Sequence, residues 1–194
     1  MASAKSPSSS SSSAAGFSLI EVLVATMLLA GALATLAQLF GLSTRANMGA
    51  RDTTFAAVLA QQKLEELRAL TWGFDTLGLP VTDISTNTAV SPETPTGGTG
   101  LAPSPSGSLG TNTNGYVDYI DQFGKKLGGG AAPPEGAIFV RRWSVEPLPS
   151  NPNNTVILQV LVFRNRNRGS ADDGKGRVLP DEARLVTVKT RKAQ

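Results

Sequence analysis

Glu21 and the residues just before it have the clearest chemical potential in this sequence. The chain of 194 residues contains neither histidine nor cysteine, so it lacks the commonest general base, the commonest metal ligand and every thiolate site. Glu21 is an acid directly before a long uncharged run, and an unpaired carboxylate within a membrane helix costs about 3 kcal/mol. It therefore needs a positively charged partner, and we expect ion pairing there rather than proton transfer.

The uncharged run from Val22 to Leu42 predicts the element that positions Glu21. It consists mostly of Leu, Ala, Val and Met, and its 21 residues match the roughly 20 that a helix needs to cross about 30 Å of hydrocarbon. We therefore expect a membrane helix. Because residues i and i+4 share one face of a helix, a carboxylate at Glu21 can reach an amine at Phe17 of its own chain or of a neighbour.

A short motif stands directly before this apolar tract: Gly16-Phe17-Ser18-Leu19-Ile20-Glu21. Motif and tract together resemble the amino-terminal processing and methylation motif of type IV pilins and of the pseudopilins of type II secretion systems. The resemblance implies a leader of residues 1–16, cleavage by a prepilin peptidase between Gly16 and Phe17, and N-methylation of Phe17. It also implies that Glu21 serves assembly, with the new amine as its partner.

The same region can be interpreted as an ordinary secretory signal. Lys5 would supply the positive charge, the tract would supply the apolar region, and Ala32-Leu33-Ala34 would be the cleavage site before Thr35. Against this interpretation, Glu21 would fall inside the apolar region and the helical pattern continues past Ala34. Lys5 also favours a cytoplasmic leader and an exported carboxyl-terminal part.

Beyond the apolar tract the pattern becomes that of an amphipathic helix. Apolar residues, among them Val58, recur at helical spacing from Phe55 to Leu70. Charged residues are expected largely on the opposite face: Lys63, Glu65, Glu66 and Arg68. We predict one helix from Phe17 to Trp72 that ends at Gly73, with a membrane and assembly half over residues 17–42 and an amphipathic half over residues 43–73.

A variable loop is predicted over residues 74–115. Within it, 27 of the 36 residues from 80 to 115 are Pro, Gly, Ser, Thr or Asn. Loops of this length are uncommon in compact domains, so the segment is either a mobile surface loop or one that a neighbouring subunit orders.

An antiparallel β-sheet domain is predicted over residues 116–194. A hairpin is expected around the turn Asp121–Gly124, and it resembles the aromatic-Asp-Gly hairpin of minor pilins. Three further runs rich in β-formers are expected as strands: 137–145, 155–163 and 184–190. Residues 155–163 are apolar on both faces except at Gln159, so this strand should be central and covered by the amphipathic helix. The fold class is α+β, with one long amino-terminal helix packed on a small antiparallel sheet.

Alternating arginines after the strand 155–163 are the remaining candidate binding residues: Arg164, Arg166 and Arg168. On one face of a continued strand they could meet phosphate or carboxylate groups, but we favour the simpler interpretation, a solvated strand end. A net charge of +3 with 17% charged residues does not indicate a nucleic-acid binder. Arg141 and Arg142 next to Trp143 predict an arginine packed on the indole ring.

The sequence as a whole predicts a structural subunit, not an enzyme, with no cofactor and no metal ion. The resemblance to minor pilins and pseudopilins implies four kinds of partner: other subunits, the prepilin peptidase, the inner-membrane assembly platform and membrane lipid, without nucleic acid. It implies a single-pass protein of the cytoplasmic (inner) membrane with an exported carboxyl-terminal domain, later part of a pilus or pseudopilus filament. Two alternatives stay open: an extracellular binding protein released by signal cleavage, and a membrane-anchored protein of another class.

Overall fold

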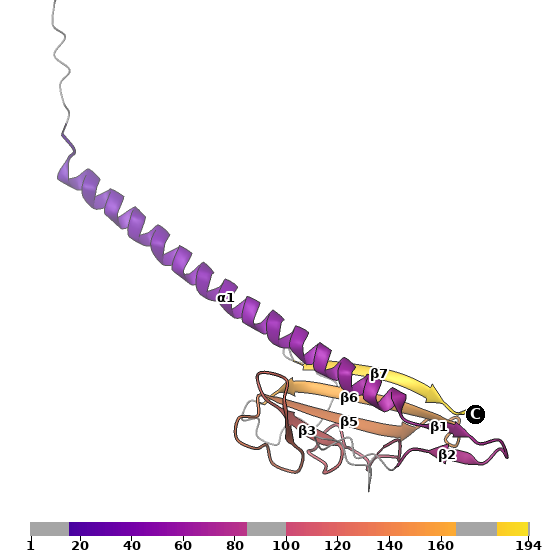
Figure 1. Ribbon diagram of the computed structural model, residues 1–194. Helices are drawn as coiled ribbons and strands as arrows, with labels where there is room; N and C mark the ends of the chain where they lie inside the picture. Colours follow the sequence, from indigo (N-terminus) through magenta and orange to yellow (C-terminus); the bar gives the residue numbers. More distant parts are fainter. Residues whose placement is uncertain (1–15, 85–99, 166–181, 194) are drawn as a thin grey trace, which may run out of the picture. The chain divides into compact units, whose positions relative to one another are not determined.

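The computed structural model of the chain describes residues 16–84, 100–165 and 182–193. Its contacts divide the chain into two compact units, residues 1–46 and 47–194. Within the described residues, the first unit contains the beginning of helix α1, and the second contains the rest of α1 and strands β1 to β8 (Figure 1).

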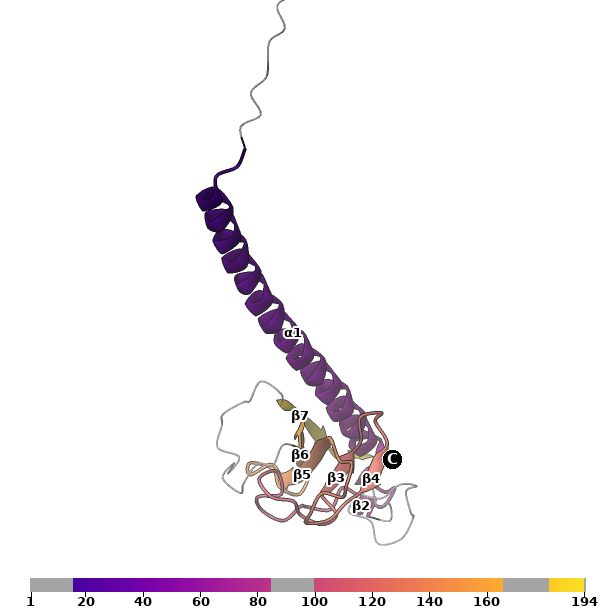
Figure 2. The ribbon, with the colours of Figure 1, turned by 90° about the vertical axis from the view of Figure 1, so that its left-hand side faces the viewer.

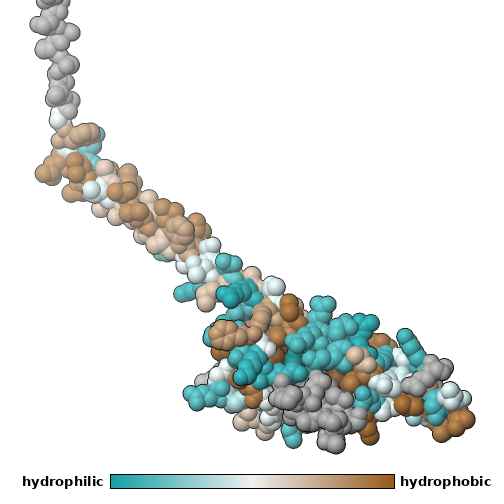
Figure 3. Space-filling model, in the orientation of Figure 1, coloured by the Kyte–Doolittle hydropathy of each residue, from teal (hydrophilic) through white to brown (hydrophobic). Residues whose placement is uncertain are grey.

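Helix α1 runs without interruption from Leu19 to Ala69, over 51 residues. Its glycines do not end it, because one glycine weakens a helix by only about 1 kcal/mol. All side chains from Leu19 to Leu42 are exposed, and apolar residues cover this part of α1 (Figure 3). By length and composition, α1 can cross a membrane.

The second part of α1 packs on the sheet through buried residues at helical spacing: Ala56, Leu59, Ala60, Lys63, Leu64 and Leu67. This buried row differs from the expected apolar face. Lys63, expected among the solvent-facing charges, is fully buried, whereas Val58 is 58% exposed. The geometry of one helical face explains both observations, since Lys63 follows the buried Leu59 by four residues and Val58 falls outside the row.

The carboxyl end of α1 lies at Ala69, three residues before the predicted end at Trp72. The helix stops early because strand β1 (Trp72–Phe74) follows almost immediately. Lys189 Nζ donates hydrogen bonds to the carbonyl oxygens of Arg68, at 2.6 Å, and of Leu70. The last carbonyls of a helix lack partners and carry partial negative charge, so an ammonium group at this position stabilises the helix end.

A five-stranded antiparallel sheet forms the body of the second unit, in the order β4-β3-β5-β6-β7. Its strands are β3 (Val117–Ile120), β4 (Lys126–Gly128), β5 (Phe139–Pro147), β6 (Thr155–Arg164) and β7 (Glu182–Thr190). The hairpin and the three later strands predicted from the sequence are all present. Figures 1 and 2 show the end of α1 on one face of this sheet, which confirms the α+β fold.

The two faces of the sheet bury separate apolar clusters. On the α1 side, alternate residues of β5 and β6 such as Trp143, Leu158 and Val160 join the buried row of α1. On the opposite side, Val117, Tyr119, Val140, Leu161 and Phe163 are buried. Strand β6 is therefore covered on both faces along most of its length, as its continuous apolar sequence indicates.

A second, smaller sheet has the strand order β2-β1-β8, with β2 at Pro80–Thr82 and β8 at Lys192–Ala193. Strands β1 and β8 run parallel and pair Gly73 with Lys192. A Cβ atom at Gly73 would lie 2.5 Å from the Lys192 carbonyl oxygen, so only glycine allows this approach. This sheet was not predicted, because its three strands have only two or three residues each.

Described parts of the predicted loop are held by the chain itself. Leu101 is fully buried in the α1-side cluster, and Ser104 exchanges hydrogen bonds with the backbone of Val145. Ser104 thereby extends the edge of the sheet along β5 beyond the start of β3. These contacts differ from both alternatives considered for the loop, since neither mobility nor a neighbouring subunit is needed for residues 100–104.

Strand β7 exposes the opposite face from the one its composition suggests. Val186 and Val188 are 55% and 57% exposed, whereas Thr187 and Lys189 are partly buried on the side of α1. The reason is a long-range contact, because Lys189 must lie on that side to reach the end of α1.

Candidate functional site

The residues Gly16 to Glu21, which carry the resemblance, lie at the start of α1. Gly16 and Phe17 precede the helix, and the Phe17 side chain is 83% exposed. The Ser18 carbonyl accepts hydrogen bonds from the backbone N–H groups of Glu21 and Val22, at 3.0 and 3.2 Å, and so begins the helix. The Gly16–Phe17 peptide bond therefore lies in non-helical backbone.

Glu21 occupies the first turn of α1 with an exposed side chain. The positive end of the helix dipole favours an acid at this position, and the spacing Ser18 to Glu21 is that of a capping box. Within residues 16–84, 100–165 and 182–193, the ion pairs do not include Glu21. Glu21 thus lies in the first helical turn, and its side chain is open to a partner outside the described chain.

A buried ion pair joins the sheet to α1 in the second unit. Asp118 of β3 and Arg141 of β5 are paired across the sheet, and both side chains are fully buried. Arg141 binds the carboxylate with two groups, Nε to Oδ1 at 2.9 Å and Nη2 to Oδ2 at 2.7 Å. Its Nη1 donates to the Leu59 carbonyl of α1 at 3.0 Å. One guanidinium group therefore connects two strands and the helix.

Lys63 and Glu66 continue this charged contact along α1. Lys63 Nζ donates to Glu66 Oε2 at 3.1 Å and lies 4.1 Å from the centre of a Trp143 ring. Lys126 Nζ approaches Glu66 Oε2 to 3.6 Å from β4. Burial lowers the pKa of the Lys63 ammonium to about 8. For Glu66, burial acts to raise the pKa, but the positive charges of Lys63, Lys126 and Arg141 lower it below its usual value.

Sequence reasoning missed these buried charges and assigned the cation over Trp143 incorrectly. Lys63, not Arg141 or Arg142, lies over Trp143, while the Arg142 guanidinium lies 4.9 Å from the Phe163 ring. The available signal was the position of Lys63, four residues after Leu59 and four before Leu67. Reading the row by spacing alone, without regard to residue type, would have placed Lys63 in the core.

Arg164 pairs with a residue of the fold and is not a solvated strand end. Its Nη1 donates to Asp52 Oδ2 of α1, so the pair ties the end of β6 to the helix. Arg166 and Arg168 lie outside the described residues. Of the three arginines, Arg164 therefore forms an ion pair within the fold.

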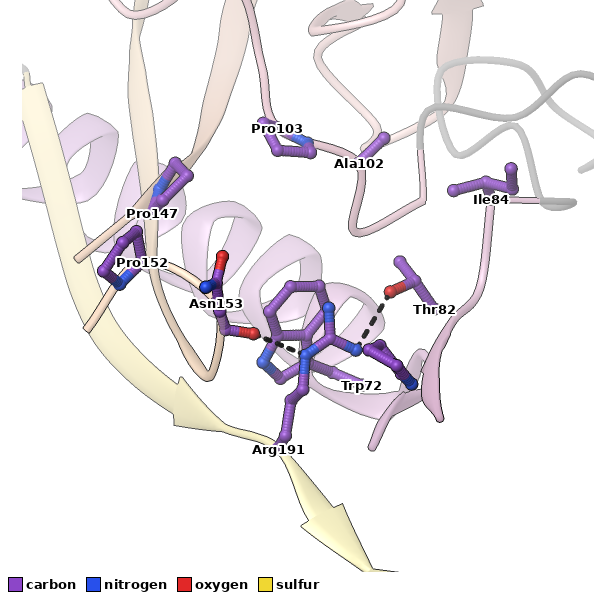
Figure 4. Close-up of a pocket in the computed structure, with 10 residues that line it drawn as sticks. Trp72, Thr82, Ile84, Ala102, Pro103, Pro147, Pro152, Asn153 and Arg191 are labelled. Carbon is purple, nitrogen blue, oxygen red and sulfur yellow. Dashed lines mark hydrogen bonds between the residues drawn. The ribbon is translucent and has the colours of Figure 1, made fainter. Parts of the chain in front are cut away.

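An open groove of about 640 Å³ lies beside the small sheet (Figure 4). Four prolines line it together with Trp72 and Arg191: Pro80, Pro103, Pro147 and Pro152. The Arg191 guanidinium stacks 3.5 Å from the Trp72 ring and donates to the carbonyls of Gly73, Val81 and Asn153. Burial lowers the pKa of Arg191. The lining can bind apolar groups, but it contains no acid, base or nucleophile pair suited to catalysis.

Other chemistry finds little support in the described residues. No group of three or more acidic side chains there is placed to hold a metal ion. No protein-family model matches this sequence, and comparison with the curated proteins and with the solved structures gives no match. A role for the residues at the start of α1 therefore has to be inferred from their chemistry alone.

The buried pair of Asp118 and Arg141 predicts that a single replacement lowers stability far more than a double replacement does. Asp118→Asn should lower the free energy of unfolding by about 3–5 kcal/mol, because Arg141 is left charged and unpaired in the interior. Asp118→Leu combined with Arg141→Met should lower it much less, since no charge remains to be buried. The measurement is denaturant unfolding of the full-length protein in detergent, and equal losses for the two variants would contradict this account of the pair.

Lys63 predicts that stability increases with pH in the mildly alkaline range. Its folded pKa is about 8 and its unfolded pKa about 10.5, so between these values the unfolded chain binds more protons and folding becomes more favourable as pH rises. The gain from pH 8 to pH 10 should be about 2 kcal/mol relative to Lys63→Met, which cannot titrate. The measurement is the free energy of unfolding as a function of pH for the unchanged protein and for Lys63→Met. Parallel curves would show that Lys63 is not a buried titrating group.

Proposed function

We propose that this chain is a pilin-like structural subunit, made as a precursor and cleaved by a prepilin peptidase between Gly16 and Phe17. Phe17 then becomes the N-methylated amino terminus. The apolar half of α1 first holds the subunit in the cytoplasmic membrane and then packs with other subunits in a pilus or pseudopilus. The proposal assigns the chain no enzymatic activity, and its partners are other subunits, the peptidase, the assembly platform and lipid.

The observation that carries this proposal is the pairing of the motif with an uncovered apolar helix. Every side chain from Leu19 to Leu42 is exposed, so residues of the described chain do not cover this surface. Burial of each large apolar side chain is worth about 1.5–3 kcal/mol, which makes lipid or another helix the only favourable surroundings. Glu21 stands at the start of this surface, where an amine at Phe17 would be within one turn.

A filament subunit lies first in lipid and then among the helices of its neighbours, and Glu21 has to be accommodated in both environments. In lipid, the Glu21 carboxylate needs a counter-charge, and cleavage creates one at Phe17. A pair within one chain would stabilise only the monomer. A pair with the neighbour's amine would also fix the axial offset between two packed helices, so a charge at the fifth residue of the mature chain supports an assembly role.

Replacement of Glu21 tests this role. Glu21→Ala should leave membrane insertion intact, because the helix becomes more apolar, and should leave cleavage largely intact, because the scissile bond lies four residues away. Loss of the intersubunit pair should reduce incorporation into filaments by about tenfold or more, since about 1.4 kcal/mol corresponds to a factor of ten. The processed protein is followed in membrane and sheared-filament fractions.

The matched control for this experiment is Glu65→Ala. Glu65 pairs with Arg68 on the exposed side of α1 and lies outside the apolar half. This variant should be incorporated like the unchanged protein. Normal incorporation of Glu21→Ala would remove the assembly role assigned to Glu21.

A further inference from the structure

Gln38 is the polar side chain of the uncharged run Val22–Leu42 whose hydrogen-bonding groups have no partner within the described residues. The other two polar side chains of this run are Thr26 and Thr35. Each threonine hydroxyl donates to the backbone carbonyl three residues earlier, at 2.9 and 2.8 Å, and is satisfied by its own helix. The amide of Gln38 is exposed and makes no such bond to the described chain.

The position of Gln38 makes this amide unfavourable in lipid unless a partner is present. No water in the hydrocarbon replaces the missing hydrogen bonds. Gln38 stands four residues before the end of the run at Leu42, about 6 Å along the helix axis. Helical side chains point toward the amino terminus, so the amide is directed into the run and away from that nearer end. It therefore needs a partner at its own depth.

The helix face around Gln38 has small residues one and two turns away. At about 100° per residue, Gly31, Ala34 and Gly41 lie within about 60° of it. Four large apolar side chains lie on the opposite face: Leu29, Leu33, Leu36 and Phe40. A Cβ atom at Gly31 or Gly41 would meet no atom within 4 Å, so packing within the chain does not require glycine there. Small residues beside a polar one allow a second helix to approach closely.

We propose that Gln38 pairs with Gln38 of a second copy of this chain, between two parallel membrane helices. A primary amide contains both a donor and an acceptor, so two amides can exchange two hydrogen bonds. Copies of one chain insert in the same orientation, which places their amides at the same depth. The contact is isologous, with its two-fold axis along the membrane normal, and it closes as a dimer.

The carboxyl end of this face is compatible with the pair. Leu42 and Arg45 lie on the same side of α1 as Gln38, but at and beyond the end of the uncharged run. Arg45 is exposed there, and lipid phosphates and salt screen the two guanidinium groups from each other. Repulsion between them therefore does not prevent the approach of the two helices around Gln38.

The pair requires a different register from the filament contact assigned to Glu21. If Glu21 binds the amine of Phe17 in a neighbour, the two helices are offset by four residues, or about 6 Å. Gln38 then lies level with Ala34 of the neighbour and cannot reach its Gln38. The level register therefore belongs to subunits in the membrane before assembly. This inference rests on the proposed function, which places the run in lipid.

Disulfide formation tests the level register, since the chain has no native cysteine. Ala34→Cys places a thiol on the Gln38 face, one turn before the amide, and Leu36→Cys places one on the opposite face. The full-length variants are treated in their native membranes with a mild oxidant. Ala34→Cys should give about tenfold more disulfide-linked dimer than Leu36→Cys, because only its two thiols come close enough to be joined.

Substitution of Gln38 separates amide bonding from packing. The purified full-length protein is labelled through Gln122→Cys, at an exposed position, and association in lipid vesicles is measured by energy transfer between copies. Gln38→Met keeps the size of the side chain but not the amide. It should lower the association constant about five- to thirty-fold, which corresponds to about 1–2 kcal/mol for an interhelical hydrogen-bonded pair. Gln38→Asn keeps the amide and should retain most of the association.

The matched control is Thr26→Val. It also removes a polar group from the run, but one that its own helix satisfies and that lies about 120° away from Gln38. Association should be unchanged. Gly31→Val keeps the amide and blocks the close approach of a second helix, so it should act like Gln38→Met.

Three results would overturn the pair: equal dimer yields from Ala34→Cys and Leu36→Cys, unchanged association of Gln38→Met, or equal losses with Gln38→Met and Gln38→Asn. The mature amino terminus and incorporation into filaments are determined for the same variants in native membranes. A chain that is not cleaved at Gly16 but still associates through Gln38 would reject the proposed function and leave the pair standing. Normal cleavage and incorporation without a dimer that depends on Gln38 would reject only the pair.

Discussion

The uncovered apolar surface at the start of α1 is the constraint on which the rest of this protein depends. A helix that exposes leucine, valine and methionine from Leu19 to Leu42 is unfavourable in water, and by length and composition it can cross a membrane. The single acid of this part, Glu21, stands at its first turn, where the helix dipole favours it. In the function proposed here, membrane insertion and assembly would use the same surface.

The second part of α1 has a different environment and a different means of attachment. Its buried row packs on the sheet, but the contact also contains the guanidinium group of Arg141, which binds Asp118 and a helix carbonyl together. Lys63 adds a second buried cation beside Trp143. Ionic contacts of this kind require one relative position of helix and strands, whereas an apolar contact alone would tolerate small shifts.

Parts of this fold could be predicted because they depend on local pattern. The apolar run, the turn at Asp121–Gly124 and the strands around Trp143 and Val160 follow from composition and spacing within short windows. Burial of Lys63 could not be inferred from its type, because it depends on Glu66 and Trp143, which the fold brings to it. The outward valines of β7 likewise depend on Lys189 and the distant end of α1. Arg164 was expected directly after the strand 155–163 and is the last residue of β6, but its partner Asp52 lies 112 residues away.

Determination of the mature amino terminus tests the central claim most directly. The protein is isolated from the membranes of cells that express the full chain, and its terminal peptide is analysed by mass spectrometry. The account predicts a chain that begins at Phe17 and carries a methyl group on its amine. A chain that begins at Thr35, or one that retains residues 1–16 in the presence of a prepilin peptidase, would contradict it.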